Sequence, residues 1–303
     1  MISVNVVKGD VVRWKGIAGQ IGYNASDNGG VFTSTCRVNV QGNIMSLLYG
    51  DNFDDKATLE NDYAFASLFD DVENNESCLI VDASNLILPA MALTDYCYAY
   101  MFYGCTSLTT APELPATTLV TGCYCGMFSG CTSLTTAPEL PATTLAYECY
   151  SDMFEGCTSL TIAPELPATT LVTICYYGMF SGCTNLNYIK CLATNISASN
   201  CTKNWVNNVA ATGIFIKADS MTSWTTGANG IPSGWTIVDD QDYIDLKKYQ
   251  ADNIYAPKAS PTFTGTPVAP TATSGDSSTQ IATTAFVQGE ISTQLGNIET
   301  LLQ

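Results

Sequence analysis

The chain has 303 residues, of which 46 % are hydrophobic and 13 % are charged, and its formal net charge is -17. The apolar content is sufficient for a folded core, and the length allows two or three domains. Between Lys56 and Lys190 there is no Lys or Arg, but there are 14 Asp and Glu residues, so binding to nucleic-acid phosphate or to an anionic membrane is not expected.

The chain contains no histidine. This removes the commonest general base, the usual nitrogen ligand of zinc and every histidine-dependent triad. We therefore expect neither enzymatic activity nor a cofactor. The enzymatic alternative is a depolymerase that uses the carboxylates of Glu148 and Asp152 in acid–base catalysis, although nothing in the sequence marks these side chains as buried or convergent.

Thirteen cysteines would suggest disulfides in a small secreted protein. However, the start Met1–Val4 has neither a basic region nor an apolar core typical of a signal peptide. No stretch of about 18 apolar residues is present to span a membrane. We expect synthesis in a reducing cytoplasm, no membrane insertion, and cysteines that are reduced, buried and structural.

Residues 1–58 are expected to form an N-terminal β region or cap. Ile2–Val6 and Val38–Val40 alternate between apolar and polar residues, and glycine and asparagine pairs separate such segments. Asn43–Tyr49 then leads into the repetitive part of the chain and is expected to begin its N-terminal cap.

A unit of 26 residues recurs almost unchanged from about Leu88 to Cys201. One full copy, CYCGMFSGCTSLTTAPELPATTLAYE, spans Cys123–Glu148. A unit this small cannot bury its own apolar face, so copies must stack on one another. Residues 59–240 are therefore predicted to form a solenoid with caps.

Both ends of this region depart from the repeat. Asp62–Phe69 resembles Asp95–Phe102 but precedes it by 33 residues, which indicates a degenerate first copy and an insertion around Glu73–Cys78. Near the other end, the tryptophans Trp205, Trp224 and Trp235 are expected to close the stack.

Each copy carries apolar residues at i, i+1, i+4, i+5 and i+8, as in Cys97, Tyr98, Met101, Phe102 and Cys105. This spacing predicts one stripe of a helix. The paired prolines that follow limit the next segment to a short strand or an extended turn. Cysteines eight positions apart on a helix are about 12 Å apart, too far for a disulfide. The predicted fold class is an α/β solenoid with a helix and a short strand per copy.

The units MFYGCTSLTTAPELPATTL and MFSGCTSLTTAPELPATTL resemble BspA-type leucine-rich repeats, which occur in surface proteins and phage proteins of Bacteroidales-like gut bacteria. Ile231–Thr236 is similar to the cap that follows such repeats. The resemblance covers residues 43–239 and implies a BspA-like leucine-rich-repeat fold.

Residues 241–258 are expected to be a linker, and residues 259–303 to form an oligomerisation segment. The sequences ASPTFTGTP, from Ala259, and TQIATTAFV, from Thr279, are similar to a segment that recurs in bacteriophage fibre proteins. Pro, Thr, Ser and Gly dominate residues 256–278, which cannot bury enough apolar surface to fold alone.

The last residues of the chain carry a heptad pattern. Leucine at a with isoleucine at d disfavours a two-stranded coiled coil, so the expected assembly is a homotrimer. The oligomerisation residues are Ile291, Leu295, Ile298 and Leu302.

A second set of positions differs from copy to copy. Surface positions drift when nothing constrains them, and this is one interpretation. The other is a diversified recognition face, favoured by the unchanged Pro-Ala-Thr-Thr segment of the same copies and by the abundance of tyrosine and small polar residues. The candidate ligand-binding residues are Tyr96, Tyr100, Tyr103, Tyr147, Glu148, Asp152, Glu155, Ile174 and Tyr177.

Glu113, Glu139 and Glu165 recur at one position, and stacking would bring them roughly 5 Å apart. Like charges placed so closely repel, and a divalent cation would relieve the repulsion. A solvated row of carboxylates is the favoured interpretation, so these residues are weak metal candidates and no other metal site is expected.

Together these features predict a virion structural fibre of a Bacteroidales-type phage, with a solenoid surface for attachment to a host surface glycan, a surface protein or mucus. Its expected partners are its own copies and other virion proteins of the capsid or tail. The alternatives are a head fibre that decorates the capsid with a mainly structural role, and a bacterial surface adhesin.

Overall fold

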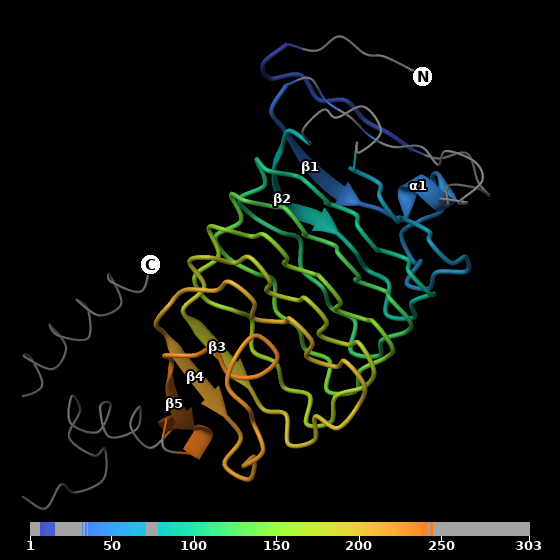
Figure 1. The fold of residues 1–303 in the computed structure, drawn as a ribbon. Helices are drawn as coiled ribbons and strands as arrows, with labels where there is room; N and C mark the ends of the chain where they lie inside the picture. Colours follow the sequence, from blue (N-terminus) through green and yellow to red (C-terminus); the bar gives the residue numbers. More distant parts are fainter. Residues whose placement is uncertain are drawn as a thin grey trace, which may run out of the picture. The chain divides into compact units, whose positions relative to one another are not determined.

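The computed structural model describes residues 7–15, 32, 34, 36–70, 78–241, 243 and 244. Between its ends the chain runs as a series of similar coils, each lying beside the next (Figure 1). No helix in this described part is long and apolar enough to cross a membrane. The regular elements are β1 (Val38–Asn43), α1 (Ser46–Tyr49), β2 (Ile80–Ile87), β3 (Tyr188–Cys191), β4 (Ile214–Lys217) and β5 (Thr236–Asp239).

Neighbouring coils pair in parallel throughout. At one end β1 pairs with β2, and at the other end β3, β4 and β5 form a three-stranded sheet in that order. Between the two sheets, single parallel bridges join residues one copy apart, such as Thr110 with Thr136 and Thr118 with Thr144. Each coil therefore returns the chain to the same place and direction, while the prolines keep the strands short.

The predicted helix in each copy is wrong: the segment is a ribbon of successive turns. Alternate N–H groups bond to the next coil, as when Tyr98 N–H donates to the Cys123 carbonyl oxygen over 3.0 Å. The intervening N–H groups close turns within the coil, as when Ala99 N–H donates to the Tyr96 carbonyl oxygen over 3.1 Å.

The backbone conformation explains why no helix forms. Every fourth residue has a positive φ, for example Tyr96 at 55°, Tyr100 at 56° and Gly104 at 67°. A right-handed helix requires negative φ at every position. A turn ribbon of period four still places i, i+1, i+4, i+5 and i+8 on one side, so its apolar pattern imitates that of a helix.

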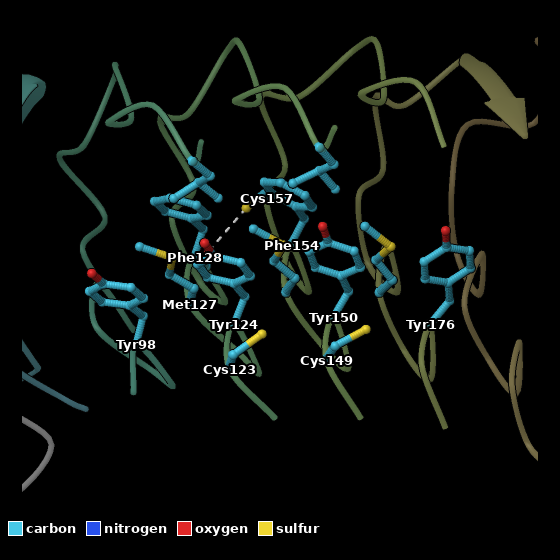
Figure 2. Packing of buried hydrophobic residues seen from close by; sticks show 14 of the residues in the cluster. Tyr98, Cys123, Tyr124, Met127, Phe128, Cys149, Tyr150, Phe154, Cys157 and Tyr176 are labelled. Carbon is cyan, nitrogen blue, oxygen red and sulfur yellow. Dashed lines mark hydrogen bonds between the residues drawn. The ribbon is translucent and has the colours of Figure 1, made fainter. Parts of the chain in front are cut away.

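The repeated apolar side chains form continuous columns in the core. Each of the five positions that begin with Cys97 and end with Cys105 is almost completely buried in successive copies. The tyrosine rings of neighbouring coils lie nearly parallel, with centroids 5.8 Å apart for Tyr98 and Tyr124 and 5.9 Å for Tyr124 and Tyr150 (Figure 2). Each coil thus completes the core of its neighbours, as a stack of small units requires.

Aromatic side chains continue the columns at the N-terminal end. Phe65 stacks on Tyr98 at 5.7 Å and Phe69 on Phe102 at 5.0 Å, which confirms the 33-residue offset of the first copy. Phe32 lies against Phe69 at 6.1 Å, and its N–H donates to the Leu68 carbonyl oxygen. Residues outside the repeat therefore cover the first coil.

Tryptophans extend the columns at the C-terminal end, as predicted. Trp205 is completely buried and stacks on Tyr176 at 6.2 Å and on Trp224 at 5.6 Å. Its indole N–H donates to the Gly230 carbonyl oxygen over 2.8 Å. Trp235 is also buried.

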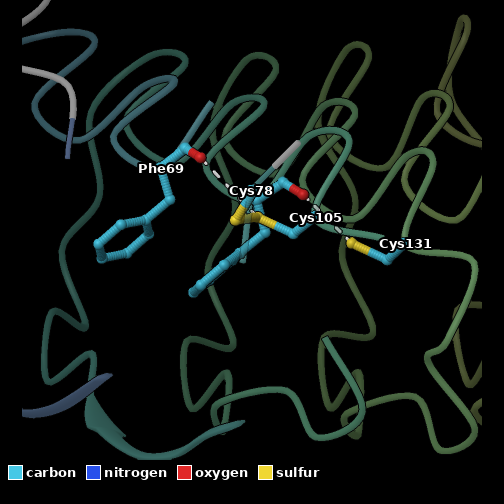
Figure 3. Close-up of a disulfide and its surroundings, with 5 residues drawn as sticks. Phe69, Cys78, Cys105 and Cys131 are labelled. Carbon is cyan, nitrogen blue, oxygen red and sulfur yellow. Dashed lines mark hydrogen bonds between the residues drawn. A yellow bond between two sulfur atoms is a disulfide. The ribbon is translucent and has the colours of Figure 1, made fainter. Parts of the chain in front are cut away.

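One cysteine pair corrects the expectation that all thiols are reduced. Cys105 forms a disulfide with Cys78, which lies 27 residues earlier at the end of the insertion (Figure 3). The cysteines equivalent to Cys105 in later copies are free, and each S–H donates to a phenylalanine carbonyl oxygen, as from Cys131 to Phe102 over 3.1 Å. The repeat pattern alone missed the disulfide because Cys78 lies outside it.

Thiol counting tests this pairing. Alkylation of the unfolded, unreduced chain is expected to label 11 of the 13 cysteines, because the other two form the disulfide. Alkylation after reduction should label all 13. Intact mass spectrometry measures both numbers, and a fully labelled chain without reductant would contradict the pairing.

Several predicted features lie outside the described residues. They include Ile2–Val6, most of the insertion, and the whole oligomerisation segment with Ile291, Leu295, Ile298 and Leu302.

Candidate functional site

The side chains at the positions that differ from copy to copy form one outward surface, which we call the variable face. It contains the nine predicted ligand-binding residues together with Tyr63 and Lys203, and the buried side chains of Cys125 and Ser151 contact it. Tyr100, Tyr103 and Tyr147 are exposed, at 39 %, 38 % and 46 %. Glu155 is also exposed, whereas Tyr96, Glu148, Asp152, Ile174 and Tyr177 are half-buried.

Tyr96 connects three coils. Its ring stacks on Tyr63 of the preceding coil, with centroids 5.1 Å apart and planes 5° apart. Its hydroxyl donates to Glu148 Oε2, two coils further on, over 2.8 Å. The ring crosses the intervening coil at Gly122, where a Cβ atom would overlap it.

Tyr100 repeats this arrangement one turn along the ribbon. Its ring lies over Gly126, where a Cβ atom would again overlap the ring. Its hydroxyl accepts a hydrogen bond from the Cys125 thiol over 3.5 Å, and the same sulfur lies 4.0 Å from Glu148 Oε1. The Tyr103 ring packs edge-on against the Tyr100 ring, with centroids 5.9 Å apart. The glycines at these two positions of one copy thus make room for aromatic rings from the copy before.

The ionisation of this cluster is shifted by its surroundings. Burial raises the pKa of the Tyr96 and Tyr100 hydroxyls, with further contributions from the Glu148 and Cys125 hydrogen bonds respectively. Burial also raises the pKa of the Cys125 thiol to about 12. The thiol is therefore protonated at neutral pH and is not a nucleophile.

Asp152 occupies the centre of the face. Ser151 Oγ donates to its Oδ2 over 2.8 Å, and Gly178 in the next coil leaves space for the carboxylate. Burial, with smaller repulsion from Glu155 and Glu148, raises the pKa of Asp152 to about 6, although the Ser151 hydrogen bond opposes the shift. At neutral pH the face therefore holds an ionised carboxylate at an energetic cost.

Because ionised Asp152 is energetically unfavourable in the folded protein, the Asp152→Asn substitution should change the free energy of unfolding in a pH-dependent way. The pKa of Asp152 is about 3.9 in the unfolded chain and about 6 in the folded chain. The folded state therefore binds more protons between these values, so this group makes the protein less stable as pH rises through that window. The substitution should increase the free energy of unfolding by about 1 kcal/mol at pH 7, after allowance for solvent screening.

Urea unfolding at pH 7 and at about pH 4 measures this effect. The increase should be much smaller at the lower pH, where Asp152 is protonated in the folded state and about half protonated in the unfolded state. An equal change in the free energy of unfolding at both pH values would show that the substitution acts through packing instead.

The variable face is open rather than enclosed. Two shallow hollows of the described residues have volumes of about 200 and 130 Å³, and no residue of the variable face lines either. Small-molecule and catalytic sites are usually concave. The carboxylates of Glu148 and Asp152 thus lie on a surface suited to an extended ligand, and the depolymerase alternative gains no support.

The repeated glutamates are not gathered into a cluster of three or more ligands in the described structure. Glu165 forms an ion pair with Lys190 at 3.3 Å, and Lys190 also pairs with Asp240 at 3.0 Å. Among the described residues, no group of three or more Cys, Asp or Glu side chains could hold a metal ion. Glu113, Glu139 and Glu165 therefore gain no support as cation ligands.

Two contributors to the face, Tyr63 and Lys203, were missed from the sequence. Tyr63 could have been found from the 33-residue offset, because it is the counterpart of Tyr96. Cys125 and Ser151 occupy the same position of successive copies. Because this position differs between copies it was expected to face outward, but both side chains are buried. The amine of Lys203 lies over the Tyr177 ring, 5.8 Å from its centroid, in a cation–π contact.

Comparison with family models, with curated proteins and with solved structures found no match for this chain.

Proposed function

We propose that this chain is a virion fibre protein whose stack of coils is a BspA-like leucine-rich-repeat solenoid. The variable face attaches the particle to a glycan or protein of the bacterial surface or to mucus. The C-terminal segment joins copies of the chain into a homotrimer and anchors them among other virion proteins. The proposal includes no catalytic step.

One observation carries the proposal: substitutions between copies are concentrated on one outward surface. The buried columns and the proline-containing segments keep the same residues from copy to copy, while the residues equivalent to Tyr96 are Gly122, Glu148 and Ile174. The changed residues are not isolated from one another. They form a connected cluster in which Tyr96 bonds to Glu148 across two coils, which supports a surface selected for recognition.

Several weak contacts acting together would give useful attachment. An open surface of small area binds weakly, but linked copies raise the effective concentration of the remaining sites after the first contact. A trimer displayed many times on a particle would therefore attach by avidity.

Attachment is tested by incubating labelled full-length protein with a panel of gut bacteria and with mucus, and measuring the bound fraction. A chain with Tyr100→Ala and Glu148→Ala should bind much less, whereas a chain with Glu139→Ala, altered in a repeated glutamate of the same region, should bind normally. Equal binding of all three chains, or no binding to any surface, would overturn the proposal.

Assembly is tested by light scattering of the full-length chain. A trimer is expected, and Leu295→Asp with Ile298→Asp should reduce it to monomers, because each charge would enter the predicted apolar seam. A monomeric unsubstituted chain would contradict the fibre assignment and favour a single-chain surface adhesin.

A further inference from the structure

The variable face combines exposed aromatic rings with carboxylates, and its one lysine, Lys203, lies at the end nearer the C-terminus, against Tyr177. Tyr100, Tyr103 and Tyr147 are each more than a third exposed. Glu148 and Asp152 lie among them, and no Lys or Arg occurs between Lys56 and Lys190. A ligand that carries positive charge would complement both features, because aromatic faces and carboxylates each attract cations.

The same face already holds one lysine in this manner. Lys203 places its amine over the Tyr177 ring, 5.8 Å from the centroid. Tyr177 occupies the position equivalent to Cys125 and Ser151 in the preceding copies. A lysine side chain is therefore accommodated at one end of the face, while the tyrosines and carboxylates nearer the N-terminus have no lysine of this chain among their described contacts.

The spacing of the coils suits an extended polypeptide. Equivalent rings of neighbouring coils lie 5.6–5.9 Å apart in the core columns. Residues on one side of an extended chain repeat about every 7 Å. The two spacings differ by about 1 Å per coil, and the flexible lysine side chain can span this difference over two or three coils, so lysines at alternate positions can reach acceptors on successive coils.

We infer that the variable face binds an extended, lysine-rich polypeptide segment, whose amines lie against Tyr100 and between the carboxylates of Glu148 and Asp152. This inference rests on the proposed attachment function and specifies its partner as a basic protein surface. The cost of the ionised Asp152 carboxylate, which arises mainly from burial and less from repulsion by Glu155 and Glu148, supports the inference, since a bound amine would offset part of that cost.

The test uses the full-length chain and a fluorescent peptide of alternating lysine and threonine, with fluorescence anisotropy as the measurement. The same peptide with acetylated lysine amines is the first control, because acetylation removes the charge and keeps the chain length. The unmodified peptide should bind, and the acetylated peptide should bind at least about tenfold more weakly.

Three variants separate this site from general attraction to an acidic protein. Asp152→Asn and Glu139→Gln each remove one negative charge, but only the first lies on the variable face. Tyr100→Leu removes an aromatic ring without changing the charge. Asp152→Asn and Tyr100→Leu should each raise the dissociation constant about three- to tenfold, while Glu139→Gln should change it less than twofold, and circular dichroism confirms that each variant is folded.

Equal binding of both peptides would overturn the inference. So would equal effects of Asp152→Asn and Glu139→Gln with no effect of Tyr100→Leu, because that pattern describes non-specific charge attraction. Displacement of the peptide by an amino-sugar oligomer at much lower concentration would assign the face to a glycan instead. Cell attachment measured in parallel separates the two proposals: attachment without peptide binding contradicts only the inference, and peptide binding without attachment contradicts the proposed function.

Discussion

Replacement of Phe128 with alanine is expected to lower the free energy of unfolding by about 3–5 kcal/mol. Phe128 is completely buried, and its ring lies 5.6 Å from that of Phe102 and 5.7 Å from that of Phe154. The substitution opens a cavity in the middle of a continuous column, and rigid neighbouring coils can collapse into it only slightly. Urea unfolding followed by circular dichroism measures the loss.

The matched control is Tyr147→Ala, an aromatic position among the coils where the side chain is 46 % exposed. An exposed substitution away from special contacts usually changes stability by about 0.5 kcal/mol or less. The Phe128 variant should also broaden the unfolding transition, because each coil contacts only its neighbours and a weak central coil divides the stack. Equal destabilisation by the two substitutions would contradict the assignment of core and surface.

Gly122→Ala is expected to destabilise the protein strongly although it adds only one methyl group. The residue has a φ of 56°, and an added Cβ atom would overlap the Tyr96 ring. The backbone strain alone costs about 1–2 kcal/mol, and displacement of the ring adds the loss of its stacking on Tyr63 and of the hydrogen bond to Glu148. We expect a total loss of about 2–4 kcal/mol in the free energy of unfolding, and loss of peptide binding.

Gly104→Ala isolates the contribution of the ring. Gly104 has a similar φ of 67°, but no atom lies within 4 Å of the position of an added Cβ atom. This variant should show the backbone strain alone and should bind the peptide normally. If both variants lost equal stability and bound equally well, the tight contact between Gly122 and Tyr96 would have no energetic or functional importance.

Burial was predictable from the sequence because identical copies must present identical residues to one another. Cys97, Tyr98, Met101, Phe102 and Cys105 were expected on one side and are all buried. The first copy was predictable for the same reason. Its aromatic residues Phe65 and Phe69 occupy the positions of Tyr98 and Phe102, and in the structure they stack on these two rings.

Local conformation was not predictable, because two backbones share the same pattern. A helix and a ribbon of four-residue turns both gather i, i+1, i+4 and i+5 on one side. The difference lies in φ at every fourth residue, and non-glycine residues such as Tyr96, Glu148 and Asp152 adopt positive φ only because contacts with neighbouring coils compensate for it. Propensity within one copy carries no information about those contacts.

The candidate site was predictable by position but not by its internal contacts. Alternation between changed and unchanged positions identified the outward residues, including Tyr100 and Tyr147. The hydrogen bond from Tyr96 to Glu148 spans 52 residues, and its path depends on a glycine in the copy between them. Comparison of equivalent positions in single copies cannot reveal a hydrogen bond between residues that are two copies apart.

The alternation of hydrogen bonds along the ribbon has a consequence for how such a protein changes in evolution. Every second N–H group is satisfied by the adjoining coil through main-chain atoms alone, so side chains on the outside do not hold the backbone together. An in-frame duplication of one whole copy can lengthen the stack without disturbing its ends, and the side chains at the new outward positions can then change without loss of the main-chain hydrogen bonds. Surface area and surface chemistry can therefore change independently of the architecture that carries them.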